Sequence, residues 1–217
     1  MISLHSRLLA ELAEWVGYIW DKSIGRYRDR ATGRLVSERT LLDLGTRYMD
    51  EFTRPNVQRL TERMIAGKLD LASWQTQVAR ELKIGHINEM LIGRGGRAAV
   101  TAADYGRVGG HLRFEYRHLD GLAQEIKAGL LSDAQIKMRI DMYVNGLKMS
   151  YAEGVEAAKV EAGYRFEQWF LGEAEHCEDC VAFAGQGRQP IGAYPTPGDG
   201  HTRCLHNCAC HKEYFRE

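Results

Sequence analysis

The sequence lacks cysteine before residue 177, net charge and any long apolar run. Lys and Arg together number 29, as do Asp and Glu, so no overall basic field marks the chain as a nucleic-acid binder. No apolar run approaches the roughly 18–20 residues that cross a bilayer, and residues 1–5 lack the charged-then-apolar layout of a signal peptide. We therefore expect synthesis in a reducing cytoplasm and no membrane partner.

Motifs of common catalytic sites are also missing. The sequence has no G-x-S-x-G elbow, no H-E-x-x-H pair and no deaminase order of H-x-E followed by P-C-x-x-C. The glycine-rich stretch 93–97 is not a phosphate loop, because no Lys-Ser/Thr follows it. We interpret that stretch as a hinge or a close contact between helices, with phosphate binding as the alternative. The sequence therefore predicts no enzyme active site.

All five cysteines follow residue 176 and form two clusters. Cys177 and Cys180 make a C-x-x-C pair, and Cys204, Cys208 and Cys210 follow a Gly/Pro-rich loop. Two thiolate pairs on tight turns, closed by a loop, are typical of tetrahedral zinc. A reducing cytoplasm favours thiolate–metal bonds over disulfides, although disulfides and free buried cysteines remain the alternatives.

A tetrahedral site needs four ligands, and more candidates than that are present. We predict a structural Zn²⁺ held by Cys177, Cys180, Cys204 and Cys208, with Cys210 as the substitute ligand. The nearby histidines are expected to be polar surface residues or neighbours of the ligands: His176, His201, His206 and His211. Residues 171–217 carry seven acidic and four basic side chains. An acidic module of this kind favours a structural role or a protein contact over binding to the DNA backbone.

The rest of the chain is predicted to form helices, because apolar residues recur at spacings of three and four. The fold class is therefore mainly α: a helical body over 1–170, followed by a small zinc-knuckle-like module over 171–217 with short strands. A hook or hairpin interrupts the body at 25–37, where Tyr27, Leu35 and Val36 flank an Ala-Thr-Gly turn. Helices are expected over 4–24, 38–53, 55–67, 71–92, 97–129, 132–162 and 164–169.

Two further patterns mark the body. Residues 60–69 align with 122–131, which predicts two helical hairpins with similar corners. The helix expected over 4–24 carries an apolar stripe that we interpret as a contact face for a partner, although the same stripe could pack internally: Leu8, Leu12, Trp15 and Ile19.

The cysteine pattern also has a familiar order. Cys177-x-x-Cys180 is followed by Gly185, a polar loop over 195–203, and Asn207-Cys208-x-Cys210. This order resembles the C-terminal signature of phage minor head proteins, the head morphogenesis family of the Mu F-like type. Many members end in His-Pro-Asn-Cys-Arg-Cys, with the His three residues before the first of the two cysteines, whereas this chain has Cys204 four residues before Cys208. An exchange of one zinc ligand for another would give this difference.

The resemblance implies a virion protein present in a few copies, made in the bacterial host cytoplasm. Its partners would be the portal or the major capsid protein, its own copies, or packaged DNA, and it would act in head assembly, DNA packaging or ejection. The alternatives are a zinc-containing nucleic-acid-binding module or, less favoured, a zinc enzyme. A nucleic-acid module would use the arginines of the hook and of the glycine-rich stretches: Arg26, Arg28, Arg30, Arg34, Arg94, Arg97 and Arg107.

Overall fold

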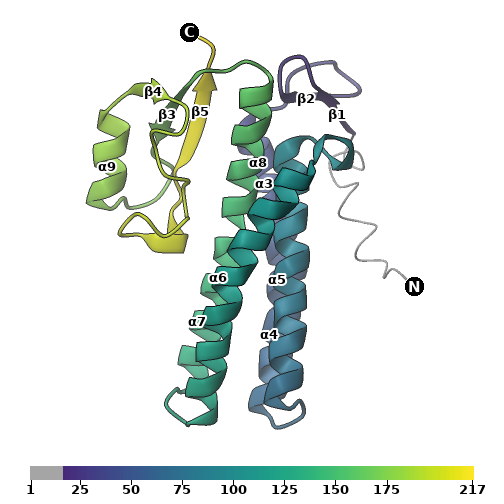
Figure 1. Cartoon of the computed structure of the whole chain (residues 1–217), viewed down its shortest axis with the longest axis vertical. Coiled ribbons are helices and arrows are strands. Elements are labelled where there is room, and N and C mark those ends of the chain that lie inside the picture. Colours follow the sequence, from purple (N-terminus) through teal and green to yellow (C-terminus); the bar gives the residue numbers. More distant parts are fainter. Residues whose placement is uncertain (1–16) are drawn as a thin grey trace.

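The computed structural model describes residues 17–217. Over this range the fold is mainly α-helical, with a two-stranded hairpin and a small C-terminal module that contains short antiparallel strands. The expected fold class is therefore confirmed. Figure 1 shows long helices side by side, with the hairpin and the module at the same end of the helical body.

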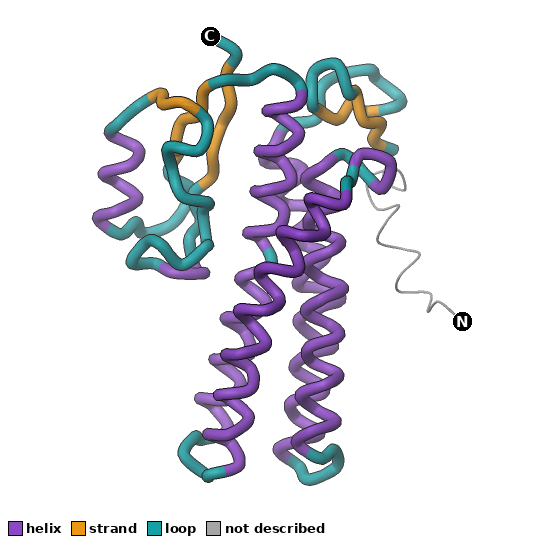
Figure 2. The backbone as a smooth tube through the Cα atoms, in the orientation of Figure 1, coloured by secondary structure: helices purple, strands orange, loops and turns teal. Residues whose placement is uncertain are grey.

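The helical body contains long helices joined by short turns (Figure 2). In chain order its elements are α3 (Glu38–Tyr48), a π-helical turn (Met49–Thr53), α4 (Arg54–Ile65), α5 (Leu71–Arg94), a 3-10 turn (Arg97–Ala99), α6 (Ala102–Lys127), α7 (Asp133–Gly146) and α8 (Lys148–Glu161).

The two predicted helical corners have the same backbone design. Gly67 after α4 and Gly129 after α6 both have φ of +67°, a left-handed conformation that favours glycine. The next helix of each hairpin then starts at a side-chain cap, from Asp70 for α5 and from Ser132 for α7. The weak sequence repeat thus corresponds to two antiparallel helix pairs with matching corners.

Apolar stripes of the two helix pairs meet in one core. Trp74, Val78 and Leu82 of α5 are fully buried, and they belong to the same cluster as Ile140 and Val144 of α7. The indole Nε1 of the buried tryptophan donates to Thr61 Oγ1 at 3.1 Å, so its polar atom is satisfied inside the core. Trp74 is therefore a core residue.

The prediction of a helix over 4–24 is wrong for the part of that segment that the structure describes. Tyr18–Asp21 forms strand β1, which pairs antiparallel with β2 (Arg26–Asp29). Leu8, Leu12 and Trp15 lie outside the described residues, and Ile19 is about half exposed at 47 % on the hairpin. Strand pairing with the following segment overrides the apolar period there.

The expected hook at 25–37 is present and extends this hairpin. Val36 N–H donates to Tyr27 O at 2.9 Å, and Asp29 N–H donates to Arg34 O at 2.9 Å, so the chain folds back around its Ala-Thr-Gly turn. Trp20 packs edge-on against Tyr27 at 4.9 Å between ring centroids. The hook and β1 therefore form one unit, and Trp20 packs inside it.

Two other expected helices are interrupted. The segment 97–129 begins with the 3-10 turn, and α6 starts after Thr101, whose side chain forms a capping box with Asp104. The segment 132–162 breaks at Leu147, which is fully buried against Gly85 of α5. No helix of the described residues is long and apolar enough to cross a membrane.

The last expected helix, over 164–169, is also wrong. Phe166–Phe170 forms strand β3, which lies between β4 (Arg188–Pro190) and β5 (His211–Phe215). Its burial alternates, because Glu167 and Trp169 face inward while their neighbours are partly exposed. The sheet that carries the cysteine loops thus begins before the expected module boundary at residue 171.

Candidate metal centre

Short elements at one end of the C-terminal module position the five cysteines. Cys177 is the residue before α9 (Glu178–Gly185), and Cys180 lies in the first turn of that helix. Cys204 and Cys208 flank a single 3-10 turn, and Cys210 immediately precedes β5. Two chain segments far apart in sequence therefore bring all five thiols to one place.

The distances between sulfur atoms match a shared metal ion. Cys177 Sγ lies 3.5 Å from Cys180 Sγ and 3.7 Å from Cys204 Sγ, and Cys180 Sγ lies 3.7 Å from both Cys204 Sγ and Cys208 Sγ. A disulfide needs about 2.0 Å, and all five cysteines are free. Sulfurs that are about 2.3 Å from one zinc ion lie about 3.8 Å apart at the corners of a tetrahedron.

The thiols form two overlapping groups. Cys177, Cys180 and Cys204 lie within 4.8 Å of one another, and so do Cys180, Cys208 and Cys210. Cys180 belongs to both groups and is 1 % exposed. Cys210 Sγ also lies 3.7 Å from Nδ1 of His176. The cluster thus has an arrangement suited to a metal ion, with Cys180 at its centre.

Aromatic side chains cover the buried side of the cluster. Trp169 of β3 is 1 % exposed, and its ring centroid lies 5.2 Å from that of Phe183 and 6.2 Å from that of Tyr194. These rings pack with the cysteines in one hydrophobic cluster. Water is therefore excluded from one side of the thiols, which strengthens electrostatic interactions there.

Burial and backbone hydrogen bonds shift the pKa values of the thiols in opposite directions. The backbone N–H of Cys180, at the start of α9, makes the largest contribution to lowering the pKa of Cys177 from 9.0 to about 7. Burial raises the pKa of Cys208 to about 12, and burial raises the pKa of Cys180 well above its ordinary value. A bound cation would supply the positive charge that stabilises these buried sulfurs as thiolates.

Polar contacts hold the two cysteine segments together. Arg203 N–H donates to Asp179 Oδ2 at 2.8 Å, and the Arg203 guanidinium also pairs with Glu178. Thr202 Oγ1 lies 3.1 Å from Cys204 Sγ. Nothing in the local sequence pattern identifies these partners, because each contact joins residues that only the fold brings together.

Apart from His176, the histidines of the module contact groups other than the thiols. His206 Nδ1 is 2.7 Å from Gly198 O, and His201 Nδ1 is 3.0 Å from Asp199 Oδ2. His211 stacks on Phe170. Among the described residues, no histidine belongs to either potential metal group.

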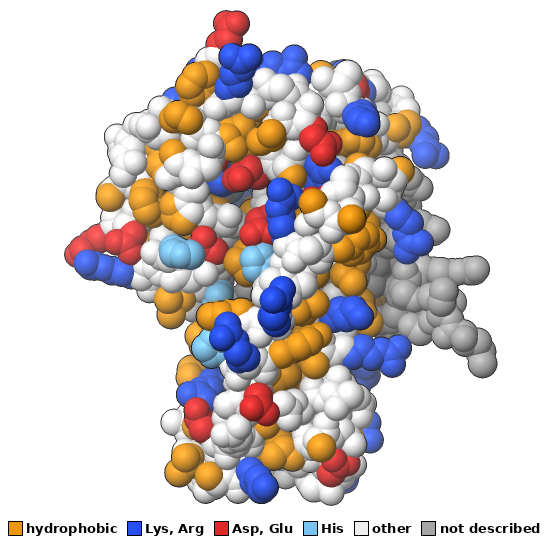
Figure 3. Space-filling model, viewed as in Figure 1, with side chains coloured by type: hydrophobic (Ala, Val, Ile, Leu, Met, Phe, Trp, Pro, Cys, Tyr) orange, Lys and Arg blue, Asp and Glu red, His pale blue; other side chains and the backbone are white. Residues whose placement is uncertain are grey.

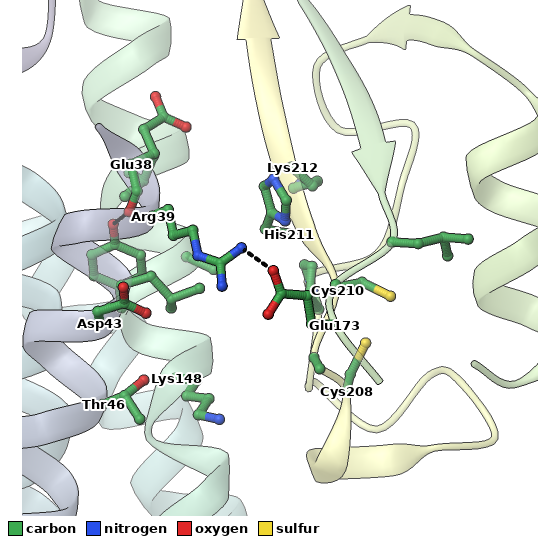
Figure 4. Close-up of a pocket in the computed structure, with 18 of the residues that line it drawn as sticks. Glu38, Arg39, Asp43, Thr46, Lys148, Glu173, Cys208, Cys210, His211 and Lys212 are labelled. Carbon is green, nitrogen blue, oxygen red and sulfur yellow. Dashed lines mark hydrogen bonds and ion pairs between the residues drawn. The ribbon is translucent and has the colours of Figure 1, made fainter. Parts of the chain in front are cut away.

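A cleft of about 420 Å³ separates the cysteine module from the helical body (Figure 4). Its walls come from α3 and α8 on one side and from residues 208–212 on the other. An ion pair between Arg39 and Glu173 spans it, with 2.9 Å between nitrogen and oxygen. The sequence offers no signal for this cleft, since the fold alone brings α3 and α8 opposite residues 208–212.

No protein-family model matches the chain, and the comparisons with curated proteins and with solved structures found no match either. The geometry of the cysteines is therefore the main structural evidence about function.

Proposed function

We propose that the protein is a non-enzymatic structural subunit of a phage head, in which one zinc ion locks the C-terminal module. The observation that carries this proposal is the cluster of free thiols, in which the cysteines of the head-protein-like signature form two groups of three that share Cys180 and lie within 4.8 Å of one another in each group. Four thiolates fill the coordination shell of zinc and leave no open position for a substrate. The centre is therefore structural.

The ligands in this proposal are Cys177, Cys180, Cys204 and Cys208. The first three are mutual neighbours, and Cys208 Sγ lies 3.7 Å from Cys180 Sγ. Cys210 lies within 4.8 Å of Cys180 and Cys208 and is the substitute ligand. Elemental analysis and native mass spectrometry of protein purified without chelator should give one zinc per chain.

Single serine variants test the ligand set. Cys204→Ser should lose zinc, because a hydroxyl is a poor ligand where zinc prefers thiolate, whereas Cys210→Ser should keep it. Equal loss in both variants would show that Cys210 is a ligand. Zinc-free wild-type protein, or a disulfide between any two of these cysteines, would refute the metal centre.

Assembly with a head component is the functional part of the proposal. Helices α6 and α7 and the turn between them expose large apolar side chains, with Leu130 at 69 %, Met138 at 59 % and Phe114 at 52 % exposure. Figure 3 shows apolar and basic side chains side by side over the lower half of the helical body. Such side chains suit contact with the portal, the capsid or other copies of the chain.

Co-expression tests this part directly. The portal and major capsid proteins of the same phage should co-sediment with the chain, and Met138→Lys with Leu130→Lys should weaken that association. A chain that stays monomeric with both proteins would contradict the assembly role, whatever its zinc content.

The structure gives little support to a broad nucleic-acid surface. Arg28 pairs with Asp21 at 2.9 Å, Arg107 pairs with Asp104 at 2.9 Å, and Arg94 is buried. Ion pairs inside the chain therefore occupy several of the arginines that such a surface would need.

A further inference from the structure

A hollow of about 670 Å³ lies between the β1–β2 hairpin and the corner that joins α5 to α6. Figure 1 shows the hairpin beside this corner at the end of the helical body. The hairpin contributes Tyr18, Ile19, Lys22 and Arg30 to its lining, and the corner contributes Arg94 and the segment that leads to α6. The arginine-rich hook and the glycine-rich stretch, which are separate in the sequence, thus share one site.

Packing fixes the two walls of this hollow against each other. Tyr27 Oη donates to Ile92 O at 3.1 Å, and Arg30 N–H donates to Gly17 O at 2.8 Å. A Cβ on Gly95 would lie 2.1 Å from Trp20 Cδ2, so glycine is what allows the indole to cover the corner. The cations of the hairpin are therefore held close to the end of α5.

Arg94 is the unusual residue of the site, because the residue is 2 % exposed and its guanidinium is incompletely paired. Its Nη2 lies 2.6 Å from Glu161 Oε1 and 2.9 Å from Ala99 O, and its Nε lies 3.0 Å from Asp104 Oδ2. Its Nη1 has no hydrogen-bond partner. A buried donor without an acceptor is costly. This atom is closed off from solvent, so a ligand oxygen would relieve that cost once the side chains that cover it shift.

The charges that line the hollow favour an anion. Among the lining residues described, Lys22, Arg30 and Arg94 are cationic and Glu161 is the carboxylate. Glu161 and the buried Asp104 both pair with Arg94, so the uncompensated positive charge comes from Lys22 and Arg30. Neither Lys22 nor Arg30 forms an ion pair within the part of the chain that the structure describes. Guanidinium and ammonium donors that converge from two elements are typical of phosphate recognition.

We propose that this hollow binds a small phosphate ester of nucleotide size. The phosphate would lie on Lys22, Arg30 and Arg94, and the rest of the ligand would lie along Tyr18 and Ile19. A volume of about 670 Å³ falls within the range of about 300–1,000 Å³ that is common for small-molecule sites. This site is independent of the metal centre, so zinc content reports on folding in its test.

Calorimetric titration of the zinc-loaded full chain with inorganic pyrophosphate and with ATP tests the proposal. We expect both to bind, and Lys22→Gln with Arg30→Gln to weaken the affinity about tenfold or more, because two charge-assisted contacts are lost. Arg34→Gln is the matched control, since Arg34 is an exposed arginine on the same hook that does not line the hollow. Its affinity should stay within about twofold of wild type.

A second variant, Arg94→Lys, keeps the charge and removes the fork of donors. It should weaken pyrophosphate binding while zinc content and helicity stay as in wild type. The proposal is overturned if neither compound binds at about 1 mM, the weak end of common small-molecule affinities. It is also overturned if the double variant binds as well as wild type.

Single-stranded oligothymidylate separates this site from a nucleic-acid groove. Binding of the oligonucleotide without binding of pyrophosphate or ATP, and with a steep salt dependence, would replace the small-ligand site with a backbone-binding surface.

Discussion

At the scale of the residue, Glu89 of α5 is the least expected side chain in the helical body. It is 1 % exposed, and its Oε1 has no hydrogen-bond partner. Its Oε2 lies where a Cβ on Gly45 would be 2.7 Å away, so the carboxyl group packs directly against α3. Burial raises the pKa of Glu89 from 4.5 to about 8, and Lys148 opposes this shift only in part.

Glu89 should therefore make stability fall as pH rises. The folded protein keeps this proton up to about pH 8, while the unfolded chain loses it near 4.5. Since the folded state binds more protons in this window, the stabilising contribution is complete below pH 4.5 and is lost as pH rises to about 8.

Urea unfolding at about pH 5 and about pH 9 measures this effect. Wild type should lose a few kcal/mol of unfolding free energy between the two pH values, because each pKa unit corresponds to about 1.4 kcal/mol. Glu89→Gln should remove most of this pH dependence. Glu62→Gln, at an exposed glutamate of α4, is the control. If Glu89→Gln loses as much stability as wild type between the two pH values, the burial argument is wrong.

At the scale of the element, glycine has opposite roles in different helices. α5 and α8 touch through their backbones, because a Cβ on Gly93 would lie 2.2 Å from Tyr151 O and one on Gly154 would lie 2.9 Å from Met90 O. On α6, a Cβ on Gly110 would meet nothing within 4 Å. The predicted close helix contact is thus found at Gly93, at the start of the glycine-rich stretch.

Alanine substitution should separate these roles. Gly154→Ala should destabilise the fold by about 1–3 kcal/mol, since the new methyl group forces two packed helices apart. Gly110→Ala should stabilise it by roughly 0.5–1 kcal/mol, because alanine favours the helix and meets no neighbour. Thermal unfolding measures both changes. Destabilisation by Gly110→Ala would mean that this face of α6 is packed against something.

At the scale of the whole molecule, the module and the body are joined by a buried ion cluster. Lys212 of β5 is 6 % exposed, and its Nζ lies 2.8 Å from Glu167 Oε2 and close to Glu156 of α8. Glu167 also accepts hydrogen bonds from the backbone N–H groups of Gly192 and Tyr194. One lysine therefore links the helical body, the sheet and the loop before the second cysteine cluster.

Removal of this lysine should loosen the joint. Lys212→Met leaves the buried carboxylate of Glu167 and the partly exposed one of Glu156 without their cation, which should cost about 3–5 kcal/mol. Lys137→Met removes an exposed pair with Glu62 and should cost less than about 1 kcal/mol. A protease should cleave the Lys212→Met variant between the body and the module faster than it cleaves wild type. Equal rates of cleavage would contradict the linking role of Lys212.

Metal removal should unfold the module and spare the body. Few large apolar residues stabilise the module, so the proposed zinc ion supplies much of its folding energy. A chelator, or Cys177→Ser, should make the module protease-sensitive while far-UV circular dichroism keeps the signal of α4 to α8. A module that remains as resistant as wild type would argue against a structural metal.

The sequence alone was enough for features that depend on neighbours along the chain. The matching corners at Gly67 and Gly129, the cap at Ser132 and the hook around Tyr27 follow from backbone preferences of a few consecutive residues. The helical body follows from the three-and-four period, and the closeness of the two cysteine clusters was predicted from their paired spacing.

Only the tertiary structure decided features that depend on distant partners. Tyr18–Asp21 and Phe166–Phe170 have apolar residues that fit a helix, yet both are strands because antiparallel partners satisfy their backbones. Three side-chain features also depend on distant partners: the unpaired Nη1 of Arg94, the buried carboxyl group of Glu89 and the link through Lys212. Their chemistry comes from burial and from charges brought in from other elements, and neither is encoded in a local pattern.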